Sequence, residues 1–165
     1  MLQSLLYVSA IVCANLAVAR FGPVAMPVIA FVLIGLDLTL RDRLHDHWQG
    51  RLLWLRMCSL IAIAGGVSYI ANPASGVIAA ASVAAFCLAS LADAAAYQLL
   101  GARTWAVRVN GSNVVGAAVD SILFPLLAFG AVPPAIVLAQ LVAKVAGGML
   151  WAFVIARLGR APSAA

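Results

Sequence analysis

A run of 36 residues without a charged side chain, 57–92, limits the fold of this chain more than any other feature of its sequence. As a single helix the run would be about 54 Å long, whereas the hydrocarbon core of a bilayer is about 30 Å thick. The run therefore has to fold back on itself. The break falls at the turn-forming stretch Ala71-Asn72-Pro73-Ala74-Ser75-Gly76. We expect two membrane-spanning helices joined by a tight turn.

The rest of the chain has the same character. Only 9% of the residues are charged and the mean hydropathy is +1.10, whereas a soluble domain carries roughly 25% charge. The sequence predicts one all-α domain over residues 1–158, a polytopic membrane bundle of six transmembrane helices, and a short cytoplasmic tail over 159–165. The expected spans are about 2–19, 24–40, 52–71, 76–100, 111–129 and 134–156. The polar segment 41–51 is expected to be the largest loop.

The distribution of basic residues predicts the orientation, because Lys and Arg are retained in cytoplasmic segments. Eight arginines fall near the ends of the second and fourth spans and in the C-terminal tail, and only Arg20 falls on the opposite side. Both termini are therefore expected in the cytoplasm. Since the basic residues form no stripe with polar flanks, we expect the lipid bilayer as a partner and no nucleic acid.

Four ionisable residues lie within or at the edge of the expected spans: Asp37, Asp93, Asp120 and Lys144. Each costs about 2.5 to 3.5 kcal/mol at the centre of a membrane helix on insertion scales. Each is therefore expected to face the interior of the bundle, either to bind something or to pair with another polar group. Asp120 and Lys144 are expected at similar depth on adjacent antiparallel helices, where they could pair.

Residues three or four positions apart share one face of a helix, which groups the polar residues into stripes. The stripes are Asn113, Gly116, Asp120 and Phe124; Gln140, Lys144, Gly147 and Trp151; and Ser90, Asp93 and Tyr97. Polar groups beside a glycine and an aromatic ring suit a small polar aromatic ligand. Asn15 on the first span could join them.

Motifs for catalysis or metal binding are missing from the sequence. His45 and His47 lie in the most polar segment with no other histidine in the chain, which favours a solvated loop. The chain has no phosphate-binding loop for ATP hydrolysis and no nucleophile motif for intramembrane hydrolysis. We therefore expect no cofactor, no metal and no enzymatic activity.

Two pairs of sequence blocks resemble the queuosine-precursor transporter family, also called the vitamin uptake transporter family. They are Met26–Phe31 leading to Asp37–Asp42, and Arg108–Asn113 leading to Val119–Phe124. Ala14-Asn15-Leu16 and Lys144 fit the same pattern. The resemblance covers about residues 10–158.

The resemblance implies a fold similar to the substrate-binding components of energy-coupling-factor vitamin importers. It also implies uptake of a deazaguanine precursor of queuosine across the bacterial inner membrane. Together with Asp93 and Phe124 from the helical stripes, it gives the expected substrate-binding residues Asn15, Asp37, Asp93, Arg108, Asn113, Asp120, Phe124 and Lys144. Arg41 also matches the family pattern, whereas Asp93 stands where the resemblance leads us to expect Gln.

Three alternatives remain open at this level. The chain could be the substrate-binding subunit of an ATP-driven importer for another vitamin, with energy-coupling subunits or a second copy as partners. It could be a membrane enzyme that uses Asp93 and Asp120 as acid and base. It could also be an assembly protein whose buried polar residues only pair with one another.

Overall fold

The structure is a computed structural model that describes residues 2–48 and 52–158. Its main elements are α1 (Leu2–Phe21), α2 (Met26–Ile29), the π-helical turn η2 (Ala30–Ile34), α3 (Gly35–Trp48), α4 (Leu53–Ala71), α5 (Gly76–Leu99), α6 (Trp105–Phe129) and α7 (Pro134–Leu158). Two short 3-10 turns, η1 (Pro23–Ala25) and η3 (Pro73–Ser75), precede α2 and α5. The described residues contain no strand, so the predicted all-α class is confirmed.

Length and composition allow most of these helices to cross a membrane. Five segments are long and apolar enough: Leu2–Phe21, Pro23–Leu44, Pro73–Leu99, Gly111–Phe129 and Pro134–Ile155. A sixth, Leu55–Ala71, is apolar but shorter. Since α2, η2 and α3 form one continuous rod, the described chain is a polytopic bundle of six helical rods.

Two helices extend past the expected ends of their spans. The segment 41–48 was expected to be part of a loop, but α3 continues through it to Trp48. Similarly, α6 begins at Trp105, six residues before the expected start of its span. Both extensions, 41–48 and 105–110, are polar, but neither contains a glycine or a proline. Polar residues end the part of a helix that lies in hydrocarbon, whereas ending the helix itself usually takes a breaker.

The tight turn between α4 and α5 lies where the sequence predicts it. Asn72 is extended (φ −153°, ψ 103°) and its Oδ1 accepts a hydrogen bond from the Ala74 amide at 3.1 Å. The Ser75 hydroxyl donates to the Ser68 carbonyl at 2.7 Å. The first bond pairs a backbone amide inside η3, and the second ties η3 back to the last turn of α4.

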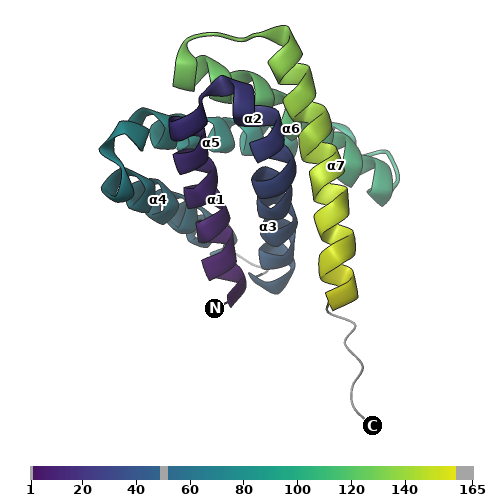
Figure 1. Ribbon diagram of the computed structural model, residues 1–165. Helices are drawn as coiled ribbons and strands as arrows, with labels where there is room; N and C mark the ends of the chain where they lie inside the picture. The colour runs from purple at the N-terminus through teal and green to yellow at the C-terminus, as the bar shows by residue number, and fades with distance from the viewer. Residues whose placement is uncertain (1, 49–51, 159–165) are drawn as a thin grey trace.

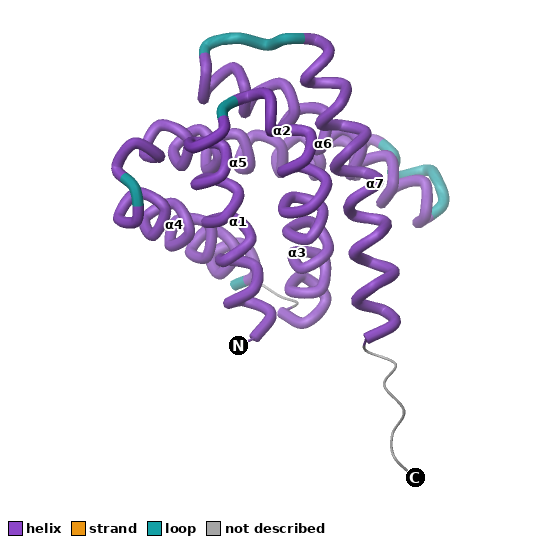
Figure 2. Tube along the Cα trace, viewed as in Figure 1, coloured by secondary structure: helices purple, strands orange, loops and turns teal. Residues whose placement is uncertain are grey.

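The rods form two groups in space. In Figure 1, α1, α3 and α7 run side by side down the view, and α4, α5 and α6 cross behind them. The tube in Figure 2 shows that α1 begins and α7 ends at the same lower side of the bundle. The most extensive helix contact joins α5 to α6, and α3 with η2 packs along α7.

The contact between α7 and the α2–α3 rod, here called the glycine seam, consists of Gly35, Gly147, Gly148, Thr39 and Trp151. A Cβ atom on Gly147 would overlap the Phe31 carbonyl oxygen, and one on Gly35 would lie 2.5 Å from the Gly147 carbonyl carbon. The two backbones therefore touch directly, as small residues permit in membrane bundles.

Two hydrogen bonds fasten the glycine seam. The Thr39 hydroxyl donates to the Gly148 carbonyl at 3.2 Å, and Trp151 Nε1 donates to the Val32 carbonyl at 2.8 Å. Val32 belongs to the π-helical turn, where the irregular hydrogen-bond ladder can leave a carbonyl open to an outside donor. The seam thus fixes how α7 lies against the rod that carries Asp37.

Gly147→Ala should destabilise the protein by about 1 to 3 kcal/mol, because its new methyl group meets rigid backbone rather than a movable side chain. Gly148→Ala is the matched control, since a Cβ atom on Gly148 would have no neighbour within 4 Å. Thermal unfolding in detergent compares the two. Equal unfolding temperatures for both variants would contradict the close contact at the seam.

Candidate functional site

A cavity of about 690 Å³ lies between the two groups of rods. Its walls come from α1, the α2–α3 rod, α5, α6 and α7, with a single contribution from α4. Small-molecule sites in proteins typically measure about 300 to 1,000 Å³. The cavity is therefore large enough for a two-ring aromatic ligand.

Seven of the eight predicted site residues line this cavity. They are Asn15, Asp37, Asp93, Asn113, Asp120, Phe124 and Lys144. The eighth, Arg108, belongs to the first turn of α6, and its side chain lies outside the described part of the structure. The structure thus brings together residues from five helices, and a role for Arg108 stays a prediction.

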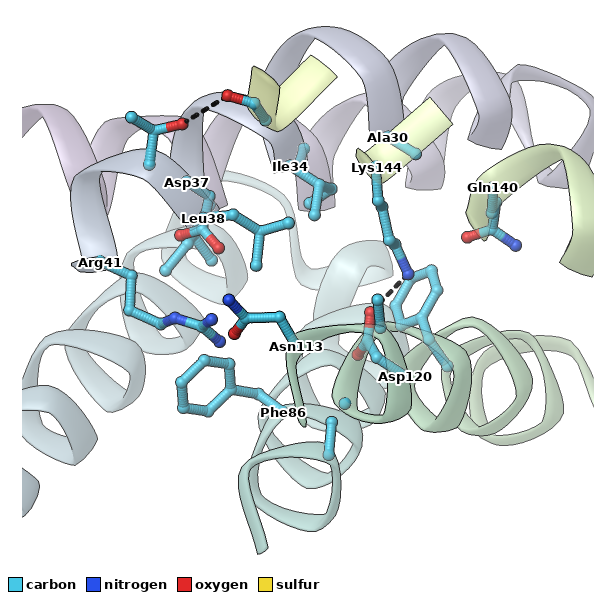
Figure 3. A pocket seen from close by; sticks show the side chains of 18 of the residues that line it. Ala30, Ile34, Asp37, Leu38, Arg41, Phe86, Asn113, Asp120, Gln140 and Lys144 are labelled. Carbon is cyan, nitrogen blue, oxygen red and sulfur yellow. Dashed lines mark hydrogen bonds and ion pairs between the residues drawn. The ribbon is translucent and has the colours of Figure 1, made fainter. Parts of the chain in front are cut away.

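Lys144 and Asp120 form the pair that their positions predict. Lys144 Nζ donates to Asp120 Oδ2 at 2.6 Å and to the Ser121 hydroxyl at 2.9 Å (Figure 3). The Lys144 side chain is 3% exposed and that of Asp120 is 28% exposed. Because both charges are already compensated, the pair lowers the cost of placing a lysine inside the bundle.

Other polar atoms of the cavity have no protein partner. Asp37 Oδ1, Asp93 Oδ1 and Gln140 Nε2 are buried and make no hydrogen bond within residues 2–48 and 52–158. Arg41 Nε also lacks a hydrogen bond there, and its ion contact with Asp42 is long, at 3.6 Å. Buried polar groups are normally paired, so these atoms are the ones available to a ligand.

Figure 3 shows where these groups lie. Asp37 and Arg41 come from α3, and the Arg41 guanidinium extends toward the Asn113 amide on α6. The Phe86 ring lies next to Asn113, on the side away from α3. Gln140 lies at the other end of the view, beyond Lys144. Carboxylates, amides and an aromatic ring therefore surround one space.

The side chain of Asn15 also makes a hydrogen bond within the bundle. Its Nδ2 donates to the Ser68 hydroxyl at 3.2 Å, and that hydroxyl donates to the Ala64 carbonyl at 2.7 Å. These bonds join α1 to α4 inside the bundle. Asn15 thus lines the cavity and also positions a wall of it.

The stripe predicted on α5 is wrong apart from Asp93. Ser90 and Tyr97 do not line the cavity, whereas Ser82, Phe86 and Ala89 do. Both series pass through Asp93 at helical spacing, and a single sequence cannot tell which adjacent face turns inward. Sequence reasoning missed Phe86, seven residues before Asp93, because a lone phenylalanine in an apolar helix gives no sign of which way it faces.

The stripe predicted on α7 serves two purposes. Gln140 and Lys144 line the cavity, whereas Gly147 and Trp151 belong to the glycine seam. The stripe on α6 lies entirely on the cavity. There Gly116 allows close approach of α5, since a Cβ atom on it would lie 3.1 Å from Asp93 Cβ.

Among the described side chains, no group of three or more His, Cys, Asp or Glu residues could hold a metal ion. The side chain of His45 lies outside that part of the structure. Cys13, Cys58 and Cys87 are free and exposed.

A family model described as "Putative vitamin uptake transporter" matches residues 61–158, more than half of the chain. The chain belongs to this family. No curated protein and no solved structure matches the chain. The matched region runs from within α4 to the end of α7 and contains Asp93, Asn113, Asp120 and Lys144. This vitamin uptake transporter family member is a multi-pass membrane protein with an internal, ligand-sized cavity.

Asp120→Ala should cost about 3 to 5 kcal/mol of stability, because it leaves the buried Lys144 ammonium with only a hydroxyl partner. Lys144→Met should cost less, since Asp120 is more exposed and faces the cavity. The double variant should recover much of the stability of the parent. Unfolding temperatures in detergent provide the measurement.

Asp42→Asn is the control for this cycle, because it removes an exposed ion contact that contributes at most about 1 kcal/mol. If both single variants unfold at the same temperature as this control, the Lys144–Asp120 pair does not stabilise the bundle.

Proposed function

We propose that this protein imports a queuosine precursor, a base of the deazaguanine type, which binds in the cavity between the helices. The family supports uptake of a vitamin-like small molecule, and the polar groups of the cavity support a planar base with several hydrogen-bonding edges. The observation that carries the proposal is the pair of buried, unpartnered carboxylate oxygens on Asp37 and Asp93 in a cavity lined by Phe86 and Phe124.

The chemistry of a guanine-like base fits these groups. Its adjacent N–H donors suit a carboxylate, which only accepts hydrogen bonds when ionised. Its carbonyl oxygen suits a donor such as Gln140 Nε2 or Arg41 Nε, neither of which makes a hydrogen bond within the described chain. Stacking on an aromatic ring is worth roughly 1 to 3 kcal/mol per base. A ligand of this kind would satisfy polar atoms that otherwise remain buried without partners.

We further propose that the protein lies in the bacterial inner membrane with both termini in the cytoplasm. The eight-to-one distribution of arginines supports this orientation. The position of the start of α1 and the end of α7 on one side of the bundle agrees with it. The lipid bilayer and a nucleobase-like substrate are then the partners, and energy-coupling subunits or a second copy of the chain would be further ones.

Asp37→Asn should weaken uptake about 10- to 100-fold in apparent affinity, because hydrogen bonds to a charged group are worth about 1.5 to 3 kcal/mol. The measurement is uptake of labelled deazaguanine base by cells that lack their own transporter. Ser90→Ala, at a position outside the cavity lining, is the control and should behave as the parent. Absence of uptake by the parent protein would overturn the proposed substrate.

The orientation can be tested in intact cells with a background in which the three native cysteines are replaced. A cysteine at Asn72 or Val132 should react with an impermeant thiol reagent added outside, because both turns are expected on the outer side. A cysteine at Gln49 should react only after the cells are opened. Labelling at Gln49 in intact cells would reverse the proposed orientation.

A further inference from the structure

The charges that line the cavity do not cancel within the described structure. The titratable groups of the lining are Asp93 on α5, Asp120 on α6, Lys144 on α7, and Asp37, Asp42, Arg41 and Arg43 on α3. The described lining residues from α1 and α4 include none. The lining thus holds four carboxyl groups and three basic groups, one acidic group more than the basic groups can pair with.

Asp93 is a carboxylate with no basic residue on its own helix and no ion pair within the described residues. Lys144 is bound to Asp120 at 2.6 Å, Arg41 contacts Asp42 at 3.6 Å, and Arg41 also lies one helical turn from Asp37 on α3. By contrast, α5 contains no Lys or Arg, and Gly116 of α6, which has no side chain to pair with a carboxylate, packs against Asp93. Within the described residues no basic group lies at ion-pair distance from Asp93, and its Oδ1 is buried without a hydrogen bond.

An unpaired carboxylate inside a membrane protein is costly, and such residues commonly mark ion or proton pathways. The base of the proposed function is neutral, so it can donate hydrogen bonds to the Asp93 carboxylate but cannot balance its charge. From this geometry we propose that Asp93 accepts a proton together with the substrate, and that the protein is a proton-coupled symporter. This inference rests on the proposed function.

A proton fits Asp93 better than a metal cation does. A metal ion needs several oxygen ligands around it, and the described side chains form no acidic cluster of that kind. A proton needs one oxygen. Once protonated, the carboxyl group both donates and accepts hydrogen bonds, so it can still bind an edge of the base.

The cycle balances in charge and atoms. One proton from water on the outer side joins the Asp93 carboxylate when the neutral base binds. Both leave on the cytoplasmic side, and the carboxylate returns ionised. One positive charge therefore crosses the membrane with each molecule of base.

The test uses the full chain in liposomes that contain no other protein, with labelled deazaguanine base as the probe. An inward proton gradient of one pH unit should drive up to about tenfold accumulation, because one unit is a tenfold ratio in proton activity. An inward sodium gradient at equal pH should give equilibration only. Addition of unlabelled base should make the outer medium more alkaline.

Variants of Asp93 separate coupling from binding. Asp93→Asn should lose accumulation above equilibrium and the alkalinisation of the outer medium, and whatever exchange of labelled for unlabelled base it keeps, slowed because Asp93 also lines the binding cavity, should not respond to a proton gradient. Asp93→Glu, which keeps a titratable carboxyl, should still accumulate the base, as should the control Ser90→Ala. If Asp93→Asn does not fold, two other results test the inference. The parent should make the outer medium more alkaline when it takes up the base, and Asp93→Glu should still accumulate the base.

Several outcomes would overturn the inference. Parent uptake that ignores the proton gradient, or accumulation by Asp93→Asn equal to that of the parent, excludes coupling through Asp93. Accumulation driven by sodium assigns the site to another cation. Exchange without any gradient dependence leaves the proposed function standing, whereas no exchange under any condition shows that the proposed substrate itself is wrong.

Discussion

The backbone contact between α7 and the α2–α3 rod is the constraint on which the cavity depends. Gly147 and Gly35 have no room for a side chain, so the two rods are held at a fixed separation. Lys144 and Gln140 lie within two turns before this contact on α7, and Asp37 lies within one turn after it on α3. Any shift along the seam would therefore move donors on one wall of the cavity relative to acceptors on the other. The Thr39 and Trp151 hydrogen bonds oppose such a shift.

Features that arise from the bilayer could be predicted from the sequence. The uncharged run 57–92 requires a hairpin, and the turn at Asn72 lies where the breakers are. The Lys144–Asp120 pair could be predicted because buried charges need partners. In two antiparallel helices joined by a short loop, residues equally far from the turn also lie at the same depth in the membrane. In both cases a large energetic penalty leaves few alternatives.

Features that arise from packing could not be predicted from the sequence. The length of α3 depends on where a breaker occurs, rather than on where polarity begins. The inward face of α5 depends on the rotation of that helix against α6, which Gly116 and its neighbours set, and this placed Phe86 in the cavity instead of Tyr97. The π-helical turn at Ala30–Ile34 has no sequence signature of its own, although it supplies the carbonyl that Trp151 binds. Such details follow from contacts between segments far apart in the chain.

The buried polar residues therefore fall into two groups with different consequences. Lys144 bonds to Asp120 and Asn15 bonds to Ser68, and these bonds hold the walls of the cavity together. Asp37, Asp93 and Gln140 keep an unbonded atom inside the same cavity. A membrane protein gains no stability from the second group, since each unbonded atom carries its full desolvation cost. The unbonded atoms of Asp37, Asp93 and Gln140 are therefore better explained by ligand binding than by folding. The bundle can carry their desolvation cost because the bonds of Lys144 and Asn15 hold the cavity walls together.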